Sequence, residues 1–239
     1  MKKILFLTVL VLHSVFGFSQ TTTAFFDKAD TFFKTYIQEG KVAYQEIKKN
    51  KKELVELTEL MTTVTVSKEN VAEYQSFWIN AYNISVINGV VSNYPLKSPL
   101  DKAGFFDKIK YQVGDQNITL NDMEHKMLRA VFPKEARFHF VLVCAGLGCP
   151  PIINQAYLPS TLEHQLAEQT KKALNDPQFI KVNKNKVQIS QLFEWYMTDF
   201  TQDGKSITAY INQYKTEKLP ENAKISFYAY DWTLNETKK

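Results

Sequence analysis

The stretch RFHFVLVCAGLGCPP, residues 137–151, decides how the rest of the chain is interpreted. Residues 138–145 are apolar except for His139, so both faces of a strand formed here would be covered by other parts of the protein. The two glycines that follow allow a tight turn, and the double proline prevents further sheet pairing. We therefore predict a buried central strand over residues 137–145, surrounded by helices.

Both cysteines of the chain lie in this stretch, and they allow two opposite interpretations. Cys144 and Cys149 are separated by four residues, two of them glycines, so a small-loop disulfide can close between them in an oxidising compartment. Alternatively, Cys149 is a free nucleophile, which requires an ionised thiol with an imidazole in reach. His139 on the predicted strand and His125 on the preceding helix are the candidate bases.

The helix expected over residues 120–131 carries a carboxylate on its apolar side. At 100° per residue, Glu124 falls in the middle of the apolar stripe. A carboxylate that faces the core needs a partner or a proton, because unpaired burial costs several kcal/mol. Arg137 and His139 are the nearest candidate partners along the chain.

Upstream, the segment YQSFWINAYNISVINGVV is apolar nearly all round, which predicts a buried helix that runs to about Asn93. Asn80 and Asn83 lie inside it, and a buried amide demands hydrogen-bond partners. One interpretation is that each amide ties a neighbouring loop to the helix. The other is that Asn80 or Asn83 orients a catalytic side chain or a substrate carbonyl.

The remaining segments predict helices and hairpins without a regular alternation of strand and helix. Apolar spacing indicates helices over residues 24–38, 51–61 and 160–175 and after Ser190 and Ser206, while alternating patterns indicate hairpins over residues 108–118 and 179–189 and a last strand at 225–230. This order is typical of the α+β class. Because the sequence has no internal repeat and no flexible linker, we expect one domain over residues 21–239.

The first twenty residues have the features of an export signal. Lys2 and Lys3 precede a mostly apolar core over residues 4–16, and small residues follow near Gln20. This core is shorter than the roughly 20 residues that a membrane span needs. We therefore expect a mature chain without a transmembrane segment, located in the periplasm or outside the cell.

The charge distribution argues against a nucleic-acid partner. The formal charge of +4 falls to +2 once the two lysines of the signal are removed. Arg129 and Arg137 are the only arginines in the sequence, whereas nucleic-acid-binding surfaces are usually rich in arginine. Because both arginines flank the central stretch and a guanidinium binds carboxylates bidentately, we expect them to anchor an anionic group of a ligand.

Taken together, the motifs resemble a known family. FWINAYN (77–83), EHKMLR (124–129), RFHFVLVCAGLGCPP (137–151) and WYMTDF (195–200) occur in the order and spacing of the family catalogued as domain of unknown function 547. The resemblance covers about residues 74–200 and implies an exported, bacterial, single-domain member, but it implies no reaction. The signature positions that it implies are Asn80, Asn83, Glu124, His125, Arg129, Arg137, His139, Cys144, Cys149, Trp195, Tyr196 and Asp199. In this chain Lys134-Glu135-Ala136 replaces the Asp-Pro pair that precedes the family arginine, so the turn there is expected to differ.

From these residues we expect a thiol-dependent hydrolase or acyl transferase that acts on a small-molecule or peptide ligand with an amide-like group. The catalytic set would be Cys149 as nucleophile, His125 or His139 as base, and Glu124 as the group that orients the base. The substrate-binding set would be Arg129, Arg137, Asn80, Asn83, Trp195, Tyr196 and Asp199. No cofactor is expected.

Two alternatives stay open. The first is a non-catalytic binding module of the cell envelope, in which Cys144 and Cys149 form a structural disulfide. The second is a metal site made by Glu124, His125, His139 and Cys149, which are residue types that zinc accepts, although no metal-binding signature is present in the sequence.

Overall fold

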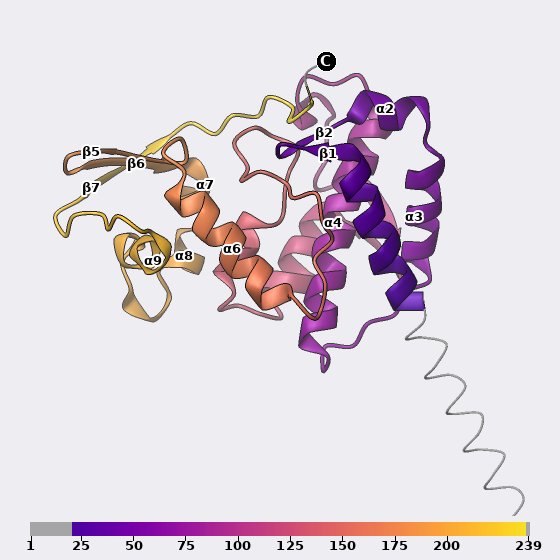
Figure 1. The fold of residues 1–239 in the computed structure, drawn as a ribbon, viewed down its shortest axis with the longest axis horizontal. Helices are drawn as coiled ribbons and strands as arrows, with labels where there is room; N and C mark the ends of the chain where they lie inside the picture. The colour runs from indigo at the N-terminus through magenta and orange to yellow at the C-terminus, as the bar shows by residue number, and fades with distance from the viewer. Residues whose placement is uncertain (1–20, 238–239) are drawn as a thin grey trace, which may run out of the picture.

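The computed structural model describes residues 21–237, and the predicted export signal lies outside them. The described chain is α+β, as predicted, with many helices and three small sheets. Figure 1 shows one group of helices built from the N-terminal part of the chain, and a second group beside the three-stranded sheet. Among the residues described, none of the helices is both long enough and apolar enough to cross a membrane.

The N-terminal part packs around one long helix. α4 (Val71–Asn93) is buried on nearly all sides, as its apolar sequence predicts. The ring of Phe25, from the first helix, lies 5.2 Å from the ring of Phe77 on α4, and α2 and α3 also pack against α4. The elements before α4 are a helix over residues 21–36, β1 (Ile37–Gln38), β2 (Lys41–Val42), α2 (Tyr44–Lys49) and α3 (Lys52–Thr62).

A hairpin and a widened helix follow the turn η1 (Pro99–Asp101). β3 (Lys110–Val113) and β4 (Gln116–Thr119) pair antiparallel, as the alternating pattern predicts. The Thr119 hydroxyl then caps the next helix by accepting a hydrogen bond from the Asp122 amide at 3.1 Å. This helix begins as α5 (Leu120–Asp122) and continues as a π-helix, η2 (Met123–Arg129). Wider winding is a feature that often marks functional sites.

The predicted central strand over residues 137–145 is wrong as a strand, although its burial is as expected. The chain forms a 3₁₀-helix, η3 (Ala136–Phe140), and then runs irregularly to Ala145. The Asn83 side chain takes the place of a neighbouring strand: its amide donates to the Val141 carbonyl and accepts from the Val143 amide, both at 2.9 Å. A side chain from α4 therefore satisfies the backbone groups that a sheet would otherwise pair.

The C-terminal part contains the three-stranded sheet. β5 (Ile180–Asn183) and β6 (Lys186–Ser190) form the predicted hairpin, and β7 (Lys224–Tyr228) pairs parallel with β6. The helices of this part are α6 (Leu162–Asn175), α7 (Gln191–Trp195), α8 (Met197–Phe200), η4 (Gln202–Gly204) and α9 (Ile207–Tyr214). Ser190 and Ser206 cap α7 and α9 as predicted.

After β7 the chain returns to the N-terminal part, which no sequence pattern predicted. Residues 229–236, drawn in yellow in Figure 1, run back from the sheet toward β1 and β2. Leu234 forms an isolated bridge with Gly146, and Glu236 forms one with Val42. The two hydrophobic clusters of the protein meet at Cys149, which packs against both of them, so the described chain is a single domain.

Candidate functional site

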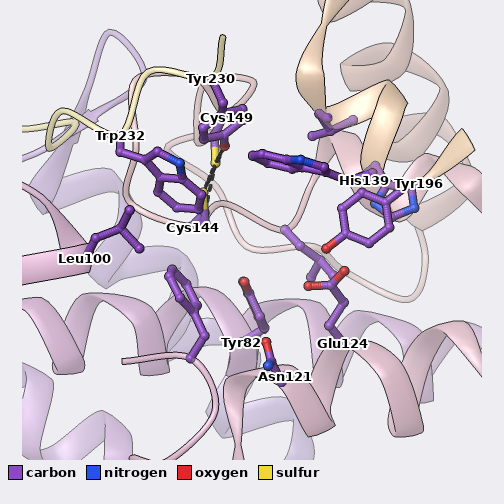
Figure 2. Close-up of a pocket in the computed structure, with 14 residues that line it drawn as sticks. Tyr82, Leu100, Asn121, Glu124, His139, Cys144, Cys149, Tyr196, Tyr230 and Trp232 are labelled. Carbon is purple, nitrogen blue, oxygen red and sulfur yellow. Dashed lines mark hydrogen bonds between the residues drawn. The ribbon is translucent and has the colours of Figure 1, made fainter. Parts of the chain in front are cut away.

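An open cavity of about 380 Å³ lies where the two clusters meet. Its wall combines residues from α4, the π-helix η2, η3, α7 and the returning C-terminal segment, and Figure 2 shows them around the opening. The lining residues are Tyr82, Leu100, Phe106, Asn121, Glu124, His139, Leu142, Cys144, Cys149, Leu192, Trp195, Tyr196, Tyr230 and Trp232.

The two cysteines form a free thiol pair on this wall. Their sulfur atoms are 2.7 Å apart, and the Cys144 backbone amide donates to the Cys149 sulfur at 3.0 Å. The Tyr230 hydroxyl lies 2.9 Å from the Cys144 sulfur and 2.7 Å from that of Cys149. Both thiols are partly exposed to solvent through the cavity.

The surroundings make the two thiols unequal. Burial raises the pKa of Cys144, but hydrogen bonds from the Cys149 thiol and the Tyr230 hydroxyl outweigh it, so the pKa lies below the ordinary cysteine value. Burial and the neighbouring Cys144 sulfur hold the pKa of Cys149 well above that value. Cys144 is therefore the first of the pair to ionise, whereas the sequence pointed to Cys149 as the nucleophile.

Glu124 faces the same cavity from the π-helix, with only 9 % of the residue exposed. Its carboxylate points into the opening, and the Tyr196 hydroxyl points toward it (Figure 2). Burial, followed by the charge of Glu124, raises the pKa of Tyr196 and also that of Tyr82, so both phenols stay protonated. The expected ion pair with Arg137 is not formed, since Glu124 makes no ion pair within residues 21–237.

His139 borders the cavity, but its carboxylate partner is not the predicted one. The Nε2 atom lies 2.7 Å from Asp199 Oδ2, and the imidazole packs against the tilted Tyr196 ring with ring centroids 4.1 Å apart. Arg129 binds the same Asp199 carboxylate through two nitrogens, at 2.7 and 3.0 Å. Burial raises the pKa of Asp199, but the hydrogen bonds and charges of His139 and Arg129 lower it well below its ordinary value.

The predicted catalytic arrangement, in which Glu124 orients an imidazole that contacts the thiol, is therefore not formed among the described residues. His125 is exposed, and its Nδ1 lies 2.5 Å from an Arg129 nitrogen. Both residues line a separate hollow beside Asp199 rather than the cavity. Because Asp199 carries the role expected of Glu124, the Glu124 carboxylate remains available to the cavity.

The arginines and asparagines expected to bind substrate are used inside the protein instead. Arg137 binds Glu135 and Glu163, with nitrogen–oxygen distances of 2.5–2.9 Å. Asn80 donates to the Tyr157 carbonyl at 2.7 Å and accepts from the Tyr157 amide at 3.0 Å. Asn80 and Asn83 therefore each tie a neighbouring loop to α4, which is the first of the two interpretations given for these amides. These three residues and Arg129 do not line the cavity.

The aromatic wall was predicted only in part. Trp195 and Tyr196 line the cavity, while Asp199 lies behind the wall. Trp195 stacks on Trp232, with centroids 6.1 Å apart and planes inclined by 27°. Sequence reasoning missed Tyr230 and Trp232, although the aromatic run YAYDW, which begins at the end of the last strand, is a signal that could have drawn attention to them.

The metal-site alternative gains no support from this geometry. Among the described residues, no group of three or more histidine, cysteine, aspartate or glutamate side chains is arranged to hold a metal ion. His125 in particular lies outside the cavity that holds the other three proposed ligands.

Comparison with known proteins identifies the family. Residues 66–173 match the family described as "Protein of unknown function, DUF547". This part of the chain belongs to that family, which confirms the resemblance seen in the motifs. The match includes Glu124 and both cysteines but ends before α7. No curated protein and no solved structure matches the chain.

Proposed function

We propose that the protein is an exported thiol-dependent enzyme of the hydrolase or acyl-transferase type, with Cys144 as the reacting thiolate and Cys149 as its proton-donating partner. The observation that carries the proposal is the free thiol pair, with sulfurs 2.7 Å apart on the wall of an open cavity. A thiolate is the nucleophilic form of cysteine. Peptide or amide-like carbonyls are the substrates that suit this chemistry.

The reaction would proceed in two steps. The Cys144 thiolate forms a bond to the carbonyl carbon, the carbon–nitrogen bond breaks, and the departing nitrogen takes the proton of the Cys149 thiol. A thioester then remains on Cys144. Water in a hydrolase, or an amine in a transferase, attacks the thioester, returns a proton to Cys149 and releases Cys144 as a thiolate.

Two neutral donors support the charged states in this scheme. The Tyr230 hydroxyl contacts both sulfurs, and burial together with the charge of the sulfurs raises the pKa of Tyr230, so it remains a donor. The raised pKa of Cys149 keeps its proton in place until the leaving group needs it. The scheme therefore needs no imidazole at the sulfur, in agreement with the engagement of His139 by Asp199.

The test uses iodoacetamide, which alkylates thiolates. We expect alkylation of the native protein at Cys144, along a pH curve whose midpoint is below the value of about 8.5 for a free thiol. Cys144→Ser should abolish this low-pH phase, whereas Cys149→Ser should keep alkylation at Cys144. Incubation with p-nitrophenyl acetate should leave an acetyl group on Cys144, detected by peptide mass.

A non-catalytic binding module with a Cys144–Cys149 disulfide is the second candidate, favoured by the same short distance between the sulfurs and by the predicted oxidising location. This candidate would replace the enzyme proposal if two results were found together. The mass of the native protein would rise by two hydrogens on reduction, and the protein would be neither alkylated nor acetylated before reduction. Intact mass measured with and without reductant makes the distinction.

A further inference from the structure

The charge of the cavity wall is one-sided. Glu124 is the only carboxylate among the lining residues, and no lysine or arginine lines the cavity. The charge of Glu124 contributes to the raised pKa of the nearby Arg129, but the Arg129 guanidinium is bound to Asp199. Within the described residues, Glu124 thus faces the cavity beside the phenols of Tyr82 and Tyr196, while His139 on the same wall is bound to Asp199. A buried carboxylate in such surroundings favours a cationic partner.

Aromatic rings surround this carboxylate. Trp195 and Trp232 line the cavity and stack on each other, with 47 % of Trp195 exposed. Tyr82 and Tyr196 flank Glu124 (Figure 2). The faces of tryptophan and tyrosine rings attract organic cations, most strongly where water is excluded. A carboxylate combined with aromatic walls is therefore chemically suited to an ammonium group rather than to an anion.

We infer that the cavity binds a ligand with an organic ammonium group on an apolar body, the ammonium lying against Glu124 and the body against Trp195 and Trp232. The volume of about 380 Å³ suits a small molecule or the end of a peptide. The inference rests on the proposed function in one respect, namely that this ammonium belongs to the substrate of the thiol pair.

The position of Glu124 also couples the ligand to the thiol. The charge of Glu124 is one of the influences that raise the pKa of Cys144. An ammonium beside Glu124 offsets that charge, so the bound ligand favours the Cys144 thiolate. Ligand binding and thiol reactivity would in this way support each other.

The test compares benzylamine, which is an ammonium ion at pH 7.5, with benzyl alcohol, its neutral counterpart, by titration calorimetry. We expect benzylamine to bind the native protein about tenfold more tightly than benzyl alcohol, because only the amine makes a charge-assisted contact. Glu124→Gln should remove this preference and leave the binding of benzyl alcohol within about twofold. Trp232→Phe leaves the carboxylate in place and should weaken the binding of benzylamine, because the larger indole ring face is lost.

Equal binding of the two compounds to the native protein, or binding of neither, would overturn the inference, and this comparison does not depend on the folding of any variant. An unchanged preference in a folded Glu124→Gln protein would overturn it as well. The Cys144→Ser/Cys149→Ser variant separates the two proposals, since it should keep the preference for benzylamine while losing all alkylation. Ammonium binding without any acyl-enzyme would leave this inference standing and remove the proposed function.

Discussion

Asn83 offers the sharpest test of how the site is held in place. Its side chain is 1 % exposed and makes two hydrogen bonds of 2.9 Å, to the Val141 carbonyl and the Val143 amide. Asn83→Ala leaves both backbone groups buried without partners, and each such group costs about 1–3 kcal/mol. The expected loss is therefore about 2–6 kcal/mol, a large share of the roughly 5–15 kcal/mol by which domains are stable. Urea unfolding followed by tryptophan fluorescence measures it.

Asn80 provides a matched control on the same helix. Asn80→Ala removes two hydrogen bonds to one backbone segment, at Tyr157, and a third to the Ser76 carbonyl of its own helix, so its cost in stability should be at least similar. Only Asn83 holds the residue next to Cys144, however. In conditions where both variants are folded, the pH midpoint of Cys144 alkylation should shift in Asn83→Ala and stay in Asn80→Ala. A loss below about 1 kcal/mol for Asn83→Ala, or equal midpoints in both variants, would refute this reasoning.

Three further changes test other parts of the structure. The pKa of Asp199 is lowered on folding, so its contribution to stability is present above the unfolded value of about 3.9 and is lost as the pH falls below it. Asp199→Asn should therefore be less stable at pH 7, and its urea midpoint should fall less steeply than that of the native protein between neutral and acid pH. An equally steep fall in the variant would contradict the ion-pair account. A Cβ on Gly148 would lie 2.8 Å from the Tyr230 ring, so Gly148→Ala should lower the melting temperature and expose the C-terminal segment to limited proteolysis; wild-type resistance would show that the contact yields easily. Because the charge of Glu124 raises the pKa of Cys144, Glu124→Gln should move the alkylation midpoint to lower pH, and an unmoved midpoint would show that the carboxylate does not act on the thiol.

Much of the fold follows from local patterns in the sequence. The apolar run of α4, the alternation in β3 and β4, and the helix that begins after Ser190 each lie where the sequence indicates. The segment over residues 136–145 does not, because a short apolar run reports burial and cannot by itself distinguish a strand from other buried backbone. What decides its conformation is Asn83, 58 residues away from Val141 in the sequence.

The site shows the same limit. The sequence drew attention to Glu124 and the cysteines, which line one cavity, because a carboxylate on an apolar stripe and paired thiols are visible locally. It could not show that Asp199 would pair with His139 and Arg129. Nor could it show that Glu135 and Glu163 would form ion pairs with Arg137. A charged residue is available to a ligand only if no partner within the fold neutralises it, and such partners are set by tertiary packing.

The return of residues 229–236 has a consequence for how the protein matures. Cys149 and Tyr230 are 81 residues apart in the sequence, and contacts of such long separation carry a high entropic cost of closing the intervening chain. The cavity wall is therefore complete only when residues 229–236 have packed against the rest of the chain, because they bring Tyr230 to the sulfurs and Trp232 to the wall. If the cavity binds the ligand inferred above, that binding would depend on contacts that join Val42 to Glu236 at the two ends of the described chain.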